Sequence, residues 1–446
     1  MDYVINFYDA ADLMTRERLF KPCFEYFHKN FTIKYLPVVL TQVKKSSKLI
    51  NSGAINSFIC RHFLKIANTN VFLDYPVETV EHIFKLDLMI YSEYQVFESI
   101  MKWVNKNEDS RKEVLPKLLT FVRWSFMDPG ELSKVKDNEL IKTLRDFDSI
   151  ISSNGDCESN RTKQNYFASI QELDDPPKLR INIFDKDLFC LPIGDFTEDK
   201  TMSTEFVHGE HMSDILFKTG RDVYRVDWAK KTFTWFDTHI AYYPVINNAI
   251  VNFQDNRSQY SCYLDAEATP LGDEIPRNSY LLLEYNDGFI YIGETEGERK
   301  YFGIFPATNS RWFDGYGRGC DHEFHATILD KDVYVFTSRS DFFSFNMETR
   351  SYNKIELFKG AKDLRLHELI LTSLHKEDDK IILIDKQREK FHVYCVKQKK
   401  WFKKSELVNL NRIEEGSNED TYELTAFTST FLSMKNIKPL FMRNFL

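Results

Sequence analysis

A hairpin pattern that returns about every 40 residues is the feature that most constrains this chain. Each unit ends with a turn and a large apolar residue, and successive closing residues are 38, 41, 40 and 49 positions apart: Phe233, Leu271, Trp312, Tyr352 and Trp401. A period of this length with several short strands per unit is typical of a propeller, because one small twisted sheet cannot bury both of its faces alone. We therefore predict a six-bladed antiparallel β-propeller over residues 178–446.

Two expectations follow from this repeat. The sixth blade should combine residues near 420–446 with a strand near 179–191, so that both ends of the array close the ring. The closing aromatics Trp312, Tyr352 and Trp401 should be buried between blades, where large side chains fill the wedge.

The first third of the chain has a helical pattern instead. Leu19, Cys23 and Phe27 recur every four residues, which places them on one helix face. Ser92 with Gln95 predicts a capping box, and Asp128 before Pro129 predicts a second helix start. We expect an all-α region up to about residue 148.

The segment 149–177 is polar and ends in Asp-Asp-Pro-Pro, so its composition predicts a linker. Tyr166, Phe167 and Ile170 are its exceptions and could pin part of it to a neighbouring domain.

Charge and cysteine content exclude several classes of protein. The chain has 59 basic and 67 acidic residues, a net charge of −8, which argues against a general nucleic-acid binder. Its seven cysteines are scattered and form no C-x-x-C, so a disulfide framework and a cysteine-based zinc site are not expected. No apolar stretch approaches the ~20 residues of a membrane helix, and the N-terminus lacks signal-peptide features. We predict a cytoplasmic protein with no nucleic-acid or membrane partner.

No motif predicts catalysis. The histidine pairs His208/His211 and His322/His325 lack a nearby third ligand, so surface or strand-edge histidines are the preferred interpretation over a metal site. Phosphate-binding glycine loops and the G-x-S-x-G nucleophile motif are missing from the sequence. We predict no catalytic residue, no metal, no cofactor and no enzymatic activity.

Two segments of the helical region resemble a known family. Residues 96–132 (VFESIMKWVNKNEDSRKEVLPKLLTFVRWSFMDPGEL) resemble the BACK signature, and residues 7–27 (FYDAADLMTRERLFKPCFEYF) resemble the last helices of a BTB domain. The repeats are similar to Kelch repeats, with Glu348-Thr349-Arg-Ser-Tyr352 as the clearest case. The resemblance to BTB–BACK–Kelch proteins implies BTB helices over 1–32, a BACK domain over 33–148, the linker over 149–177 and a Kelch-like propeller over 178–446.

The chain departs from this family in two ways. The Gly-Gly pair of Kelch blades is replaced, for example by Thr337-Ser338 and Asp385-Lys386, which indicates divergent blades. The resemblance also begins only at the last BTB helices, whereas the preceding part of the BTB domain supplies the dimer interface and most of the cullin contact in this family. From this we expect either a late start or the loss of those functions. We also expect the isolated chain to be a monomer with a weakly held N-terminal helix pair, or a poorly soluble fragment.

The resemblance implies a protein-interaction adaptor that captures a client protein on the propeller and acts as substrate receptor of a cullin-type ubiquitin ligase. The alternative is a scaffold protein that binds actin or the cytoskeleton without ubiquitin transfer. Carried over position by position, the partner-binding residues of the propeller face are Arg257, Arg277, Ser279, Glu323, Arg339, Arg365 and Gln387.

Overall fold

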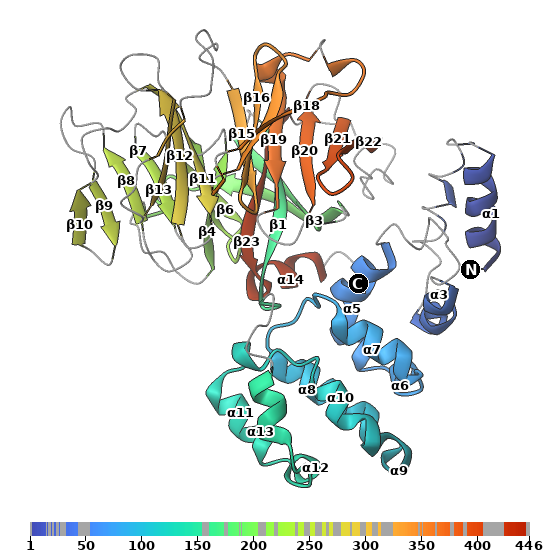
Figure 1. Ribbon diagram of the computed structural model, residues 1–446. Helices are drawn as coiled ribbons and strands as arrows, with labels where there is room; N and C mark the ends of the chain where they lie inside the picture. The colour runs from blue at the N-terminus through green and yellow to red at the C-terminus, as the bar shows by residue number, and fades with distance from the viewer. Residues whose placement is uncertain are drawn as a thin grey trace. The chain divides into compact units, whose positions relative to one another are not determined.

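The computed structural model describes residues 2–42, 54–153, 160–236, 324–404 and 423–442, with short gaps in the first, third and fourth ranges. Over 240–313 it describes the backbone of eight strands. The chain forms two compact units, one of residues 1–164 with 432–446 and the other of residues 165–431 (Figure 1). We call them the helical unit and the β-rich unit. Among the described helices, none is long and apolar enough to cross a membrane.

The helical unit consists of short helices around one apolar core. Phe63, Phe72 and Phe84 are fully buried there and meet edge to face, an arrangement that aromatic rings favour. Its α-helices before residue 164 are α1 (Asp2–Leu13), α3 (Leu36–Gln42), α5 (Ala54–Ala67), α6 (Asn70–Leu73), α7 (Val77–Lys85), α8 (Glu93–Asn105), α9 (Glu108–Arg111), α10 (Leu115–Leu119), α11 (Pro129–Lys136), α12 (Glu139–Lys142) and α13 (Phe147–Ser153).

The predicted helix starts at Ser92 and Asp128 are confirmed. The Ser92 hydroxyl accepts a hydrogen bond from the Tyr94 amide at 3.0 Å, and Asp128 accepts one from the Gly130 amide at 2.8 Å. Gln95 reaches back as expected, but it accepts from the amide of Tyr91 and not from that of Ser92. These caps satisfy amides that the first turn of a helix leaves without partners.

The β-rich unit is built from antiparallel hairpins. Four sheets have four strands each: β7 to β10, β11 to β14, β15 to β18 and β19 to β22. Within each of these sheets the strands pair in chain order. Their bounds are β7 (Ile240–Pro244), β8 (Ile250–Gln254), β9 (Ser261–Leu264), β10 (Glu267–Pro270), β11 (Asn278–Tyr285), β12 (Gly288–Glu294), β13 (Lys300–Phe305), β14 (Arg311–Phe313), β15 (Phe324–Leu329), β16 (Asp332–Thr337), β17 (Phe342–Asn346), β18 (Tyr352–Ile355), β19 (Leu369–Ser373), β20 (Lys380–Asp385), β21 (Lys390–Cys395) and β22 (Lys400–Lys404).

A fifth, seven-stranded sheet joins the two ends of this unit, in the order β23-β1-β2-β3-β6-β5-β4. Its late strand β23 lies beside β1, whereas the sequence predicted a pairing with a strand near 179–191, which corresponds to β2 in the same sheet. The expectation that residues up to 446 belong to this blade is wrong for 434–442, which form a helix that groups with the helical unit. A parallel pairing of only two residue pairs, Thr197 with Thr232 and Glu198 with Phe233, connects β3 to β6. The strands are β1 (Lys163–Leu173), β2 (Lys178–Phe184), β3 (Cys190–Glu198), β4 (Met212–Phe217), β5 (Asp222–Asp227), β6 (Thr232–Phe236) and β23 (Glu423–Ser433).

The structure corrects the linker prediction. Within 149–177, residues 163–173 form β1, which pairs with both β2 and β23. Five consecutive residues, Tyr166 to Ile170, are buried. A strand covered on both faces loses the apolar–polar alternation that marks a half-buried strand, so composition alone misled the prediction.

Of the two closing aromatics whose side chains are described, Trp401 lies against the neighbouring sheet and Tyr352 does not. Trp401 is half-buried, lies 5.3 Å from the Phe342 ring of the preceding sheet, and donates from Nε1 to the Glu356 carbonyl at 2.8 Å. The prediction for Tyr352 is wrong, because its side chain is 45% exposed on the outer strand β18. The side chain of Trp312 lies outside the described residues.

Candidate functional site

The first residues of β15 and β19 lie at one end of the β-rich unit. His325 Nε2 is 2.9 Å from the Leu366 carbonyl oxygen, and further along the strands Thr327 and Ser373 join their hydroxyls at 2.8 Å. Since the contacts advance together along both strands, β15 and β19 run in the same direction side by side (Figure 1). The starts of the two strands therefore lie at one end, which we call the loop end.

Arg339 stands in a tight turn at this loop end. The turn joins β16 to β17, and the pairing of Phe324 with Thr337 places it beside the start of β15. The Thr337 amide donates to the Asp341 carbonyl at 3.0 Å, and Ser340 takes a φ of 59°. This backbone geometry holds the Arg339 side chain on the exposed surface.

Arg365 stands at the same end, directly before the short helix Leu366–Glu368 that leads into β19. Leu366 anchors the segment in the core, while the Arg365 side chain is 73% exposed and lies 3.8 Å from a Glu368 oxygen. The Lys386 amide donates to the Glu368 carbonyl at 2.9 Å, which ties the turn after β20 to this end as well. Loops held by a rigid sheet are where binding residues most often lie.

The remaining predicted partner-binding residues are not placed by the described side chains. Arg257, Arg277, Glu323 and Gln387 lie outside the described residues, and Ser279 lies in β11, where the backbone alone is described. The structure thus places Arg339 and Arg365 at a common end, and the binding role of all seven residues stays a prediction.

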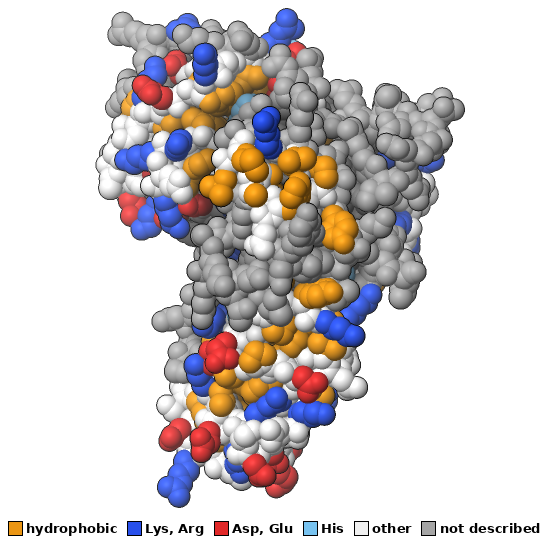
Figure 2. All heavy atoms as spheres, turned by 90° about the vertical axis from the view of Figure 1, so that its right-hand side faces the viewer, with side chains coloured by type: hydrophobic (Ala, Val, Ile, Leu, Met, Phe, Trp, Pro, Cys, Tyr) orange, Lys and Arg blue, Asp and Glu red, His pale blue; other side chains and the backbone are white. Residues whose placement is uncertain are grey.

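The loop end can bind by charge and hydrogen bonding. An exposed guanidinium offers a planar fork of donors that fits carboxylates. Figure 2 shows that acidic and basic side chains are interspersed over the described surface of one face, without a continuous basic field. In the part of the chain that is described, no three histidine, cysteine, aspartate or glutamate residues form a group that could hold a metal.

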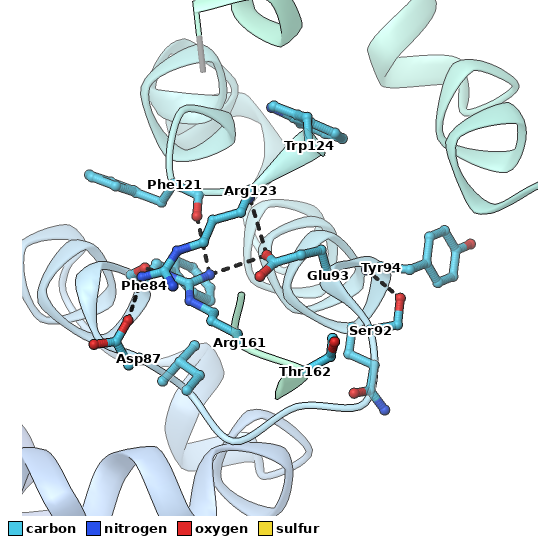
Figure 3. A network of polar contacts seen from close by, with 12 residues as sticks. Phe84, Asp87, Ser92, Glu93, Tyr94, Phe121, Arg123, Trp124, Arg161 and Thr162 are labelled. Atoms are coloured by element: carbon cyan, nitrogen blue, oxygen red, sulfur yellow. Dashed lines mark hydrogen bonds and ion pairs between the residues drawn. The ribbon is translucent and has the colours of Figure 1, made fainter. Parts of the chain in front are cut away.

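A buried ionic network in the helical unit escaped the sequence analysis (Figure 3). Arg161 and Glu93 are 1% and 0% exposed, and Arg161 Nη1 lies 3.2 Å from Glu93 Oε2. The same guanidinium donates to the carbonyls of Phe84 and Phe121. Arg161 lies in the range predicted as a linker. The sequence would have pointed to it only if the strand β1, which begins two residues later, had been predicted.

The network extends to Arg123. Its amide donates to Glu93 Oε2 at 3.2 Å, and its side chain pairs with Asp87 at 2.7 Å. Among the described residues, Glu93 Oε1 and Arg161 Nε have no hydrogen-bond partner. Burial raises the pKa of Glu93 above its ordinary value, and the nearby charges of Arg161 and Arg123 oppose this rise. The network joins α8 to the residues that lead into β1, so its role is to hold that segment in the helical unit.

Comparison with known proteins agrees with the helical pattern. The family model described as "BACK: BTB And C-terminal Kelch" matches residues 45–136, a range that contains α5 to α11. Kelch-like protein 6 of Homo sapiens is 29% identical over 153 residues, which are 34% of this chain and 23% of that protein. Kelch-like protein 2 of Rattus norvegicus is 28% identical over 138 residues, 30% of this chain and 23% of that protein. The matches thus span about a quarter of the length of these relatives.

Proposed function

We propose that this chain, which is a member of the BTB–BACK–Kelch family, is a non-enzymatic adaptor that captures a client protein on its β-rich unit. The observation that carries the proposal is the BACK match over 45–136 in a chain whose following residues form repeated antiparallel sheets. A helical unit joined to an array of sheets with exposed loops suits two binding tasks, one for each unit.

The β-rich unit is proposed to be a six-bladed Kelch-like propeller. Strand β23 with β1 to β3 would form one blade, β4 to β6 a second, and the four four-stranded sheets the others. The narrow two-residue pairing between β3 and β6 supports a boundary between two blades at that point. The pairing of β23 with β1 would close the ring, which leaves no exposed seam between its first and last strands.

The client would be bound at the loop end. Arg339 and Arg365 are exposed there, and their guanidinium groups favour an acidic segment of the partner. The other predicted positions, Arg257, Arg277, Ser279, Glu323 and Gln387, are proposed to belong to the same surface. The helical unit would bind a cullin scaffold, which makes the chain a cytoplasmic substrate receptor of a cullin-type ubiquitin ligase.

Charge reversal at the loop end tests the client surface. We expect the double variant Arg339→Glu/Arg365→Glu of the full chain to lose client proteins that the wild type captures from a cell lysate under cross-linking. Lys399→Glu is the matched control, because Lys399 is exposed in the turn between β21 and β22 at the opposite end of its sheet. If both variants retain the same captured proteins as the wild type, the client is not bound at the loop end.

The same capture tests the ligase role. Recovery of a cullin with the wild-type chain and with both variants supports the proposed receptor, since the loop end should not affect the cullin. Recovery of clients without a cullin would refute the ligase role. Co-sedimentation of the chain with actin filaments would then favour the scaffold alternative.

A further inference from the structure

The helical unit is completed by a segment that follows the β-rich unit in the chain. Residues 432–446 group with residues 1–164, and α14 (Met434–Met442) is the helix of this segment (Figure 1). The Met434 amide donates to the Thr162 carbonyl at 2.8 Å. Ile437 and Leu440 are buried, while Lys435 and Pro439 are exposed on the opposite positions of the helix. A short helix attached in this way can be released without unfolding the rest of the chain.

Lys438 is the unusual residue in this helix, because its side chain is buried. It is 1% exposed, its Nζ donates to the Met89 carbonyl, and the same atom lies 5.3 Å from the centre of the Tyr91 ring. Among the described residues, no carboxylate forms an ion pair with it. A buried ammonium group without a counter-ion is costly, so burial favours the neutral amine and lowers the pKa of Lys438 to about 7.

Among the residues that the structure describes, the titratable groups around Lys438 supply no negative charge. On α5, Arg61 and Lys65 are basic, and His62 is close enough for the Lys438 charge to act on it. Burial first, and then these three cationic neighbours, lower the pKa of His62 to about 4, so His62 stays neutral near pH 7. Burial raises the pKa of Tyr91, which therefore stays a neutral phenol there. Lys438 is consequently the group whose charge changes near neutral pH.

We propose that α14 is a proton-controlled latch on the helical unit, docked when the Lys438 amine is neutral and released more readily when that amine is protonated. A released lysine binds its proton up to about pH 10.5, whereas the docked lysine gives it up above about pH 7. Between these values the released state binds more protons, so docking strengthens as the pH rises. Below about pH 7 both states are protonated, and this contribution no longer changes.

Hydrogen exchange in the full chain tests the latch. Exchange rates of the α14 amides, corrected for the intrinsic effect of pH, give the opening constant of the helix. From about pH 6.5 to about pH 8.5 we expect this constant to fall about twentyfold, because one proton is linked to opening across most of that range. The amides of α8 serve as the internal reference and should show no such change.

Two lysine variants distinguish the titration of Lys438 from a general effect of pH on the opening of α14. Lys438→Met keeps a long apolar side chain without a charge, and its α14 amides should be protected equally at both pH values. Lys435→Met removes the exposed lysine of the same helix and should keep the wild-type dependence. An opening constant of wild-type α14 that is equal at both pH values overturns the proposal, even if Lys438→Met fails to fold. The proposal also fails if α8 follows the same dependence or if Lys438→Met retains it.

Discussion

Among the described residues, one fully buried arginine–carboxylate pair lies in each unit, and the two pairs are built differently. In the β-rich unit, Arg225 and Asp214 face each other across β5 and β4, with two hydrogen bonds of 2.8 and 2.9 Å. In the helical unit, a single hydrogen bond of 3.2 Å joins Arg161 Nη1 to Glu93 Oε2, and the two residues are 68 positions apart in the chain. The first pair forms because the antiparallel register of β4 and β5 sets Asp214 opposite Arg225. The second pair forms only when segments far apart in the chain pack together.

This difference predicts how much stability each unit loses when the arginine of its buried pair is replaced. The Arg225 guanidinium also donates to the Ser203 carbonyl at 2.7 Å, so all three of its nitrogens are bonded. The Arg161–Glu93 pair leaves one atom of each residue without a partner among the described residues. We expect the pair with more hydrogen bonds to lose more stability when its arginine is removed, because the remaining buried carboxylate loses two hydrogen bonds at once.

The largest effect is therefore expected from Arg225→Met, which removes two hydrogen bonds from the buried Asp214 carboxylate. We expect the free energy of unfolding of the β-rich unit to fall by about 5 kcal/mol. Denaturant unfolding followed by segment-resolved hydrogen exchange measures this loss. Arg180→Met is the matched control, since Arg180 makes the same two-bond contact with Asp195 at the surface. Arg180→Met should lower the free energy of unfolding by less than about 1 kcal/mol. Equal losses for Arg180→Met and Arg225→Met would show that burial does not strengthen the pair.

Arg161→Met should destabilise the helical unit by about 3 kcal/mol, a smaller loss because Glu93 keeps the Arg123 amide and can take up a proton. The double variant Glu93→Leu/Arg161→Met should recover most of this stability, since neither charge is then buried alone. Thermal unfolding of the wild type, the double variant and both single variants, Glu93→Leu included, gives the coupling between the residues. A double variant whose loss equals the sum of the two single losses would show that the two side chains act independently.

Trp401 and Tyr352 occupy equivalent closing positions and should respond differently to truncation. Trp401→Ala is expected to cost about 3 kcal/mol, because the ring packs on Phe342 and Tyr394 and its indole nitrogen is hydrogen bonded. Tyr352→Ala should cost less than about 1 kcal/mol, since the ring is 45% exposed. Urea unfolding of both variants compares them directly, and similar midpoints would contradict the wedge role of Trp401.

The smallest effect is expected at the helix caps. Ser92→Ala removes the acceptor of the Tyr94 amide and should lower the stability of the helical unit by about 1 kcal/mol. Ser110→Ala, in the exposed part of α9, should change it by a few tenths of that amount. Thermal denaturation of these variants resolves the difference, and an unchanged midpoint for Ser92→Ala would show that the cap is not needed.

The sequence could predict features that depend on neighbouring residues. Ser92 and Asp128 mark helix starts through atoms two residues away, and the Asn346–Tyr352 hairpin is set by its own turn. The repeat predicted that a late strand joins the first sheet of the array, but it predicted a partner near 179–191 and not β1.

Features that depend on distant contacts were missed. Strand β1 is buried on both faces and lacks alternation, so its polar flanks dominated the prediction. The Arg161–Glu93 pair and the position of α14 in the helical unit join residues far apart in the chain, and no local pattern records such contacts. At the loop end, the local turn is enough to predict that Arg339 is exposed. That Arg339 and Arg365 lie at the same end follows only from the side-by-side packing of β15 and β19, which the sequence does not show.

The position of α14 in the chain also affects how the protein is made. A ribosome adds about 5–20 residues per second, so the residues between Gln164 and Leu432 take roughly ten to fifty seconds to synthesise. During that interval the helical unit has emerged without its last helix, and the surface near Met89 and Tyr91 stays uncovered. We therefore expect the nascent chain to expose an apolar site that chaperones can recognise until α14 docks.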